Sequence, residues 1–170
     1  MYSLNVPVPG RVARLAADLA PELSAFDRVR DRHTLVLKRL GDPDPDEHAR
    51  IQQRARRALA GTGPFEARIA RVGRFERPPA GPAPVVYLAV EEAGLRAAHQ
   101  RLVEEFTAVE GMEGDAYVPH VTLARGGATE AAARLSGREV GPVTWTVEEL
   151  VFRADASGTG GPAGRIRLPA

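Results

Sequence analysis

Apolar residues in the first half of the chain follow the spacing of strands and helices in turn. Residues 2–8 alternate as in a strand, and Pro9 and Gly10 then open a segment whose apolar residues recur every three or four positions, as on one face of a helix. The later elements follow from aliphatic and β-branched runs and from helix-start signals. The pattern predicts a strand at 2–8, a helix from Gly10, a strand at 33–40, a helix at 44–59 and a strand at 65–72.

A turn-rich segment, PPAGPAP at 78–84, separates this half from a second half in which the order of elements repeats. The VVYLAV run at 85–90 is apolar on both faces, which indicates a buried strand. The second half is predicted to contain strands at 85–90, 118–125 and 143–147, helices at about 95–109 and 129–135, and short closing strands at 150–152 and 165–168.

Each half therefore consists of a strand, a helix, a strand that carries a histidine, a helix and a strand. The two halves are not obviously similar in sequence, so the duplication rests on the order of elements alone. We predict an α+β fold in a single domain, 1–170, with two pseudo-equivalent lobes at about 1–77 and 84–170. An exchange of strands between the lobes is left open.

Composition narrows the function classes without selecting one. A chain of 170 residues with 44% hydrophobic and 26% charged residues fits one soluble domain, and no apolar run is long enough to cross a membrane. The chain has no cysteine and its N-terminus lacks a secretory signal pattern, so a cytoplasmic protein is expected. The net charge of +1 lacks the overall excess of basic residues that is typical of nucleic-acid-binding proteins, but it is compatible with a small basic pocket. A monomer is the default expectation.

The segment Tyr117-Val-Pro-His-Val-Thr-Leu-Ala-Arg125 carries the strongest chemical signal. Side chains alternate along a strand, so His120 and Thr122 share one face, and Arg125 lies near the strand end. An imidazole, a hydroxyl and a guanidinium together suit a phosphate. Taken alone, His-x-Thr is a weak pattern, and a strand histidine that is satisfied by a neighbouring carbonyl is equally compatible with it.

His33-Thr34 opens the matching strand of the first half. Two histidines that meet across a cleft suit cleavage of a cyclic phosphodiester, because one imidazole can activate water while the other protonates the leaving oxygen. An unperturbed histidine titrates near neutral pH, so both roles are available without a metal. The other histidines, His48 and His99, have no partner at metal-ligand spacing, and we expect no metal and no cofactor.

These motifs and the two-lobed order resemble the 2H phosphoesterase superfamily. Within it, the chain is most similar to the LigT-like group of 2′-5′ RNA ligases and RNA 2′,3′-cyclic phosphodiesterases. The resemblance implies a bilobal fold with antiparallel strands and flanking helices around a central cleft. It also implies a hydrolase that opens a 2′,3′-cyclic phosphate without a metal, usually to a 2′-phosphate, and in some members joins RNA reversibly through a 2′-5′ linkage.

Under this resemblance His33 and His120 are the catalytic pair, and Thr34, Thr122 and Arg125 contact the phosphate. Lys38 is a further phosphate candidate, and Tyr117 is a candidate for stacking on a base.

The first motif departs from the family pattern, because the chain has His33-Thr34-Leu35 where His-x-Thr is expected. Alignment on Gly41 instead puts Thr34 at the histidine position and Val36 at the threonine position. Three interpretations stay open. A β-bulge aims both His33 and Thr34 at the cleft, His33 acts with Lys38 or an arginine in place of the threonine, or the first half-site has lost its chemistry.

The sequence leaves three functions in competition. The leading hypothesis is an enzyme of RNA processing that acts on cyclic phosphate ends of RNA. The same chemistry on a small cyclic nucleotide is an enzymatic alternative. A non-catalytic module that binds RNA ends is the third, and the irregular first motif is the feature that supports it.

Overall fold

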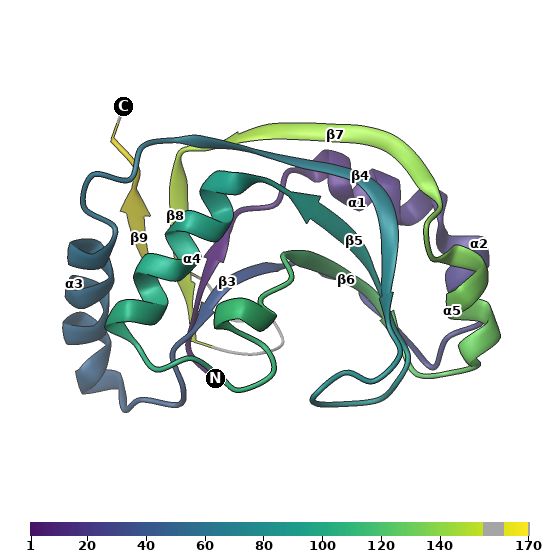
Figure 1. Cartoon of the computed structure of the whole chain (residues 1–170), viewed down its shortest axis with the longest axis horizontal. Coiled ribbons are helices and arrows are strands. Elements are labelled where there is room, and N and C mark those ends of the chain that lie inside the picture. The colour runs from purple at the N-terminus through teal and green to yellow at the C-terminus, as the bar shows by residue number, and fades with distance from the viewer. Residues whose placement is uncertain (155–161, 170) are drawn as a thin grey trace.

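The computed structural model describes residues 1–154 and 162–169, and one antiparallel sheet with flanking helices dominates it (Figure 1). The strands are β1 Ser3–Val6, β2 Arg28–Val29, β3 Leu35–Arg39, β4 Phe65–Phe75, β5 Val85–Glu91, β6 His120–Arg125, β7 Glu139–Val147, β8 Glu149–Arg153 and β9 Pro162–Arg167. The helices are α1 Gly10–Asp18, α2 Ala20–Leu23, α3 His48–Ala58, α4 Ala93–Glu105 and α5 Thr129–Leu135, with short 3-10 turns η1 Pro45–Glu47 and η2 Gly114–Ala116. The predicted α+β class is confirmed. In the described part of the chain, no helix is both long enough and apolar enough to cross a membrane.

The strands follow the order β7-β4-β5-β6-β3-β1-β8-β9, and β2 pairs with β6. Strand β4 comes from the first half of the chain but lies between β5 and β7, which come from the second half. In the other direction, β8 comes from the second half and pairs with β1. Figure 1 shows α3 and α4 at one end of this sheet and α2 and α5 at the other. Each end is therefore built from both halves of the sequence.

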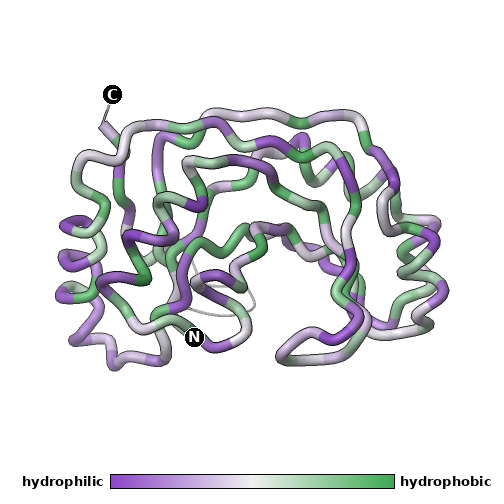
Figure 2. Tube along the Cα trace, viewed as in Figure 1, coloured by the Kyte–Doolittle hydropathy of each residue, from purple (hydrophilic) through white to green (hydrophobic). Residues whose placement is uncertain are grey.

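Alternation along the central strands separates a core face from a second face of the sheet. Leu4, Leu35 and Val121 are fully buried members of the main hydrophobic core. Their neighbours along the strands, such as Asn5 and Thr34, therefore point to the opposite side. We call this opposite side, which carries Asn5, Thr34, His120 and Thr122, the site face. Figure 2 shows the same alternation as changes between apolar and polar residues along the strands.

An interruption in strand pairing lies at the centre of the site face. Arg28 pairs with Arg125, and the N–H of Arg30 donates to the Leu123 carbonyl at 2.8 Å. The next pair is Leu35 with Val121, so residues 31–34 together lie opposite the single residue Thr122. The strand predicted at 33–40 begins at Leu35 for this reason, and β2, which the sequence analysis missed, occupies the earlier part of the ladder. Such an insertion re-aims side chains locally.

Candidate active site

Strand β6 brings an imidazole and a hydroxyl together on the site face. His120 and Thr122 are both partly exposed, whereas Val121 and Leu123 between and beside them are fully buried. His120 Nδ1 lies 2.7 Å from the Val118 carbonyl oxygen. A carbonyl can only accept, so in the neutral ring Nδ1 carries the proton and Nε2 keeps its lone pair. The local backbone thus fixes His120 as a proton acceptor through Nε2.

The surroundings of His120 favour its neutral form. Burial is the largest influence and lowers the pKa of His120, while the hydrogen bond to Val118 acts in the opposite direction. The positive charges of Arg39 and Arg125 lower this pKa further. These influences favour the uncharged form of His120, which is the form that can accept a proton.

Arginine side chains around β6 create a local excess of positive charge. Burial first, and then the charges of Arg30 and Arg39, lower the pKa of the Arg125 guanidinium. Arg125 donates to the Ala80 carbonyl at 3.0 Å, and its Nε is buried with no hydrogen-bond partner among the described residues. Arg39 Nη1 lies 3.8 Å from a carboxylate oxygen of Glu113, beyond hydrogen-bonding distance. An anion such as a phosphate would relieve the repulsion among the three arginines.

Arg39 is a further candidate site residue, and the sequence analysis missed it. The pairing of β1 with β3 shifts between Leu4 and Asn5, so Leu37 and Lys38 are both fully buried although they are adjacent. This shift breaks the alternation of the strand. The direction of Arg39 therefore cannot be deduced from the sequence, and only the pairing of the strands reveals it.

The pairing of β3 with β6 relates the two half-sites. Leu35 pairs with Val121, and both point into the core. The flanking residues Thr34 and Val36 therefore lie on the site face, opposite Thr122 and His120 respectively. An antiparallel pair has a local twofold axis, here between Leu35 and Val121. Each of these two residues is preceded by one site-face residue (Thr34 and His120) and followed by another (Val36 and Thr122), so the axis relates Thr34 to His120 and Val36 to Thr122. Position 34, rather than position 33, is the symmetric counterpart of the β6 histidine.

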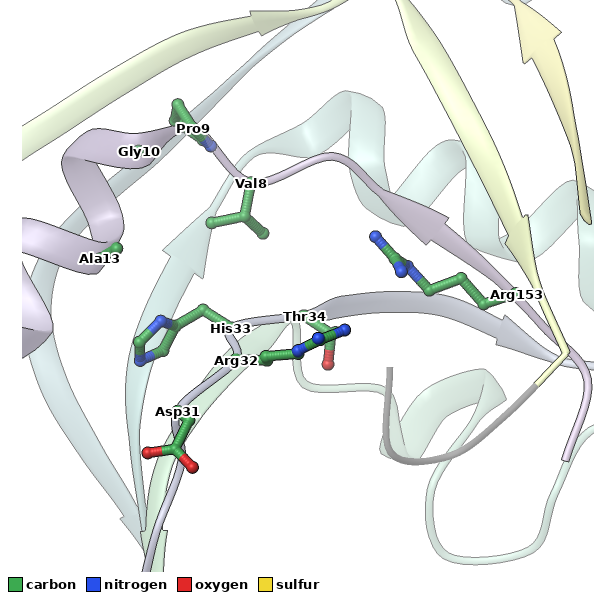
Figure 3. Close-up of a pocket in the computed structure, with 9 residues that line it drawn as sticks. All are labelled: Val8, Pro9, Gly10, Ala13, Asp31, Arg32, His33, Thr34 and Arg153. Carbon is green, nitrogen blue, oxygen red and sulfur yellow. The ribbon is translucent and has the colours of Figure 1, made fainter. Parts of the chain in front are cut away.

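His33 lies in a pocket of about 270 Å³ beside the first turn of α1. Thr34, Arg32 and Arg153 line the same pocket, with Asp31 at its edge (Figure 3). In Figure 3 the imidazole of His33 extends toward α1, whereas Arg32 extends the other way, toward the side of Arg153. Burial lowers the pKa of His33, and the Asp31 carboxylate partly opposes this. The insertion at 31–34 thus brings His33 and Thr34 to one pocket, which His120 does not line.

Lys38 does not have the phosphate-binding position that the sequence suggested. Its ammonium group is buried and donates to the Glu113 carboxylate at 2.6 Å, to the Arg39 carbonyl at 2.7 Å and to the Thr107 carbonyl at 3.0 Å. These acceptors use all three of its N–H groups. Lys38 is a buried structural cation that anchors the segment after α4.

Tyr117 is likewise unsuited to stacking on a base. Its side chain is only 4% exposed, and its ring stacks on His99 with centroids 3.7 Å apart. The Tyr117 hydroxyl donates to the Val36 carbonyl at 2.9 Å. His99 in turn contacts the Leu37 carbonyl through Nδ1 and accepts from the Gly114 N–H through Nε2. This network fixes the chain that leads into His120 against β3.

The described residues contain no group of three or more His, Cys, Asp or Glu side chains placed to hold a metal ion. The chemical groups that the site offers are imidazoles, hydroxyls and guanidinium ions, which suit an anionic substrate.

Comparison with known proteins relates the chain to solved structures and to one protein family. The chain is similar in structure to E. coli LigT complexed with 3′-AMP (17% identity, 98% of this chain and 97% of that chain covered, TM-score 0.71) and with NADP⁺ (18%, 99% and 98%, TM-score 0.70). It is also similar to TT0787 of Thermus thermophilus (22%, 98% and 97%, TM-score 0.63). The chain thus has the fold of E. coli LigT and TT0787. Residues 33–159 match the 2′-5′ RNA ligase superfamily, and the chain belongs to this superfamily. A search of curated proteins finds no match.

Proposed function

We propose that the protein is a metal-independent phosphoesterase that opens 2′,3′-cyclic phosphates at RNA ends. The observation that carries this proposal is the contact of His120 Nδ1 with the Val118 carbonyl, which leaves Nε2 to accept a proton on the face that Thr122 shares and near the Arg39 and Arg125 charges. The guanidinium ions and the hydroxyl would hold the phosphate oxygens and stabilise the charge that develops on them in the transition state.

The reaction requires one proton acceptor and one proton donor. His120 takes a proton from water as the water oxygen forms a bond to phosphorus. The bond between phosphorus and the ribose 3′ oxygen breaks, and His33 donates a proton to this oxygen, which leaves a 2′-phosphate. Burial lowers the pKa of His33 and the Asp31 carboxylate partly opposes this, so we expect the protonated acid to be lost as the pH rises. Attack by a 5′-hydroxyl in place of water would form a 2′-5′ linkage by the same steps.

RNA ends and small nucleotides both fit this proposal. The related E. coli LigT has been crystallised with ATP, with NADP⁺ and with 3′-AMP, which supports a nucleotide as the minimum ligand. The residues named so far address the phosphate and the ribose oxygens. They favour neither an RNA chain nor a mononucleotide.

A second candidate function is binding of RNA ends without catalysis. It is favoured by the register of β3, which puts Thr34 and Val36, rather than a histidine and a threonine, opposite the β6 half-site. With a single imidazole on the paired strands, a phosphate could be held but no second group would protonate the leaving oxygen.

Hydrolysis of a short RNA with a 2′,3′-cyclic phosphate end, in excess EDTA, separates the two functions. We expect turnover by the wild type and a loss of roughly a hundredfold to ten-thousandfold in His120→Ala and in His33→Ala, because each removes one proton-transfer group. His48→Ala is the matched control, since His48 stacks on Tyr2 outside the site. Turnover that survives in His120→Ala would refute the mechanism. Wild-type protein that binds the RNA end but never cleaves it would favour the binding module.

A further inference from the structure

A small aromatic cluster on the site face is separate from the main core. Val85, Tyr87 and Ala89 of β5 form it, with Phe75 of β4 packed against them. The alternate residues of β5, Val86 and Leu88, belong to the main core instead. The cluster therefore lies on the same side of the sheet as His120.

The rings of this cluster contact His120 directly. Phe75 and Tyr87 lie with centroids 4.3 Å apart, and the imidazole of His120 lies 5.0 Å from Phe75 and 5.2 Å from Tyr87. The backbone is shaped to admit these rings. A Cβ on Gly73 would come within 2.4 Å of the Tyr87 ring, so glycine at this position lets Tyr87 lie across β4.

Packing of the core does not account for the partial exposure of Phe75. Tyr87 is 9% exposed and contacts Phe75 and His120, whereas Phe75 is only partly buried. The Phe75 ring borders the imidazole of His120, which in turn lies near the positive charges of Arg39 and Arg125. Apolar rings beside cationic groups are the combination with which proteins hold single-stranded nucleotides, by base stacking and phosphate contact together.

We propose that Phe75, supported by Tyr87, is the stacking platform for the nucleobase of the nucleotide whose phosphate lies at His120. This proposal rests on the proposed phosphate site and adds that the ligand is a nucleotide rather than any phosphate ester. Stacking uses the face of the ring and not the edges of the base, so all four bases are accepted.

Equilibrium binding measured by calorimetry tests the platform independently of catalysis. We expect Phe75→Leu to weaken adenosine 3′-monophosphate about tenfold to a hundredfold, because a base on an aromatic ring contributes an affinity of this size. Affinity for inorganic phosphate is expected to stay unchanged. Phe75→Tyr, which keeps the ring, is expected to bind the nucleotide like the wild type.

Phe106→Leu is the matched control, because Phe106 lies under the Arg54 guanidinium at 4.6 Å, away from the cluster. Unchanged nucleotide affinity in folded Phe75→Leu would overturn the platform. A wild-type protein that binds adenosine 3′-monophosphate no better than inorganic phosphate would overturn it too. Ring-dependent nucleotide binding without any hydrolysis would instead refute the catalytic function and support the platform.

Discussion

At the scale of single residues, His120 combines a fixed tautomer with a lowered pKa. The Val118 carbonyl accepts the Nδ1 proton, and burial beside Arg39 and Arg125 disfavours a second proton. These influences act on the same ring and leave Nε2 as an acceptor. The residue is thereby suited to start a reaction by removing a proton, rather than to donate one.

The pH profile of turnover follows from this lowered pKa. A base must be unprotonated, so kcat/KM is expected to fall as the pH decreases through the pKa of His120. Because that pKa is lowered, the acidic limb is expected below about 6.5, the ordinary value for histidine. Arg39→Gln removes a nearby positive charge and is expected to move the limb to higher pH. A wild-type limb above the ordinary value would contradict the assignment.

At the scale of elements, the β3–β6 pair decides which residues face one another. Leu35 opposite Val121 puts position 34 across from Thr122, and the insertion at 31–34 carries His33 into the pocket near α1. The ladder of β2, which resumes pairing at Arg30, fixes the other end of this insertion. The proposed acid therefore belongs to an irregular segment, and the proposed base belongs to a regular strand.

A designed restoration tests this register. Thr34→His with Val36→Thr rebuilds on β3 the arrangement that His120 and Thr122 have on β6. Added to His33→Ala, the two changes are expected to recover turnover by at least about tenfold, because position 34 faces the β6 half-site. Hydrolysis of the cyclic phosphate, compared with His33→Ala alone, gives the measurement. A folded triple variant with no recovery would show that position 34 cannot serve the reaction.

A buried ion pair joins Lys38 of β3 to Glu113 in the segment after α4. Burial alone would raise the pKa of Glu113, but hydrogen bonds from Lys38 and from the N–H groups of Arg39 and Val109 hold it below its usual value. The same carboxylate accepts the Val109 N–H, and the backbone is already extended at Phe106, so the helix predicted to reach Val109 stops earlier. α4 accordingly ends at Glu105.

Loss of one partner of this pair is expected to be costly. Lys38→Met leaves the Glu113 carboxylate buried without its cation and is expected to lower the free energy of unfolding by about 3–5 kcal/mol. Urea unfolding measures the change. The double variant Lys38→Met/Glu113→Gln is expected to be more stable than Lys38→Met, since it removes the uncompensated charge. Equal stability of wild type and Lys38→Met would show that the pair is not structurally important.

At the scale of the whole molecule, the two halves of the sequence share one sheet and one main core. β4 completes the pairing of β5 and β7, and β8 completes that of β1. We therefore expect one cooperative unfolding transition. Far-UV circular dichroism and the fluorescence of Trp145, the single tryptophan, are expected to give the same urea midpoint. Separate midpoints, or native-like structure in an isolated 1–77 fragment, would contradict the prediction that both halves unfold in one cooperative transition.

The sequence by itself determined the α+β class, most of the elements and the alternation of side chains along β6. Strand alternation depends only on local backbone geometry, so the shared face of His120 and Thr122 follows directly from their spacing. The apolar faces of the helices follow from spacing in the same way. The resemblance of His120, Thr122 and Arg125 to the family motif could be recognised in the sequence because all three lie in one strand.

Only the tertiary structure decided the rest of the site. The insertion opposite Thr122 depends on where β2 and β3 each join β6, and no local pattern encodes a register between distant strands. The burial of Lys38 and Tyr117 depends on Glu113 and His99, which lie far away in the sequence. Phe75 and Tyr87 reach His120 through the pairing of β4, β5 and β6. Contacts of this kind exist only once the chain has folded, because they join segments whose separation along the chain carries no information about their distance in space.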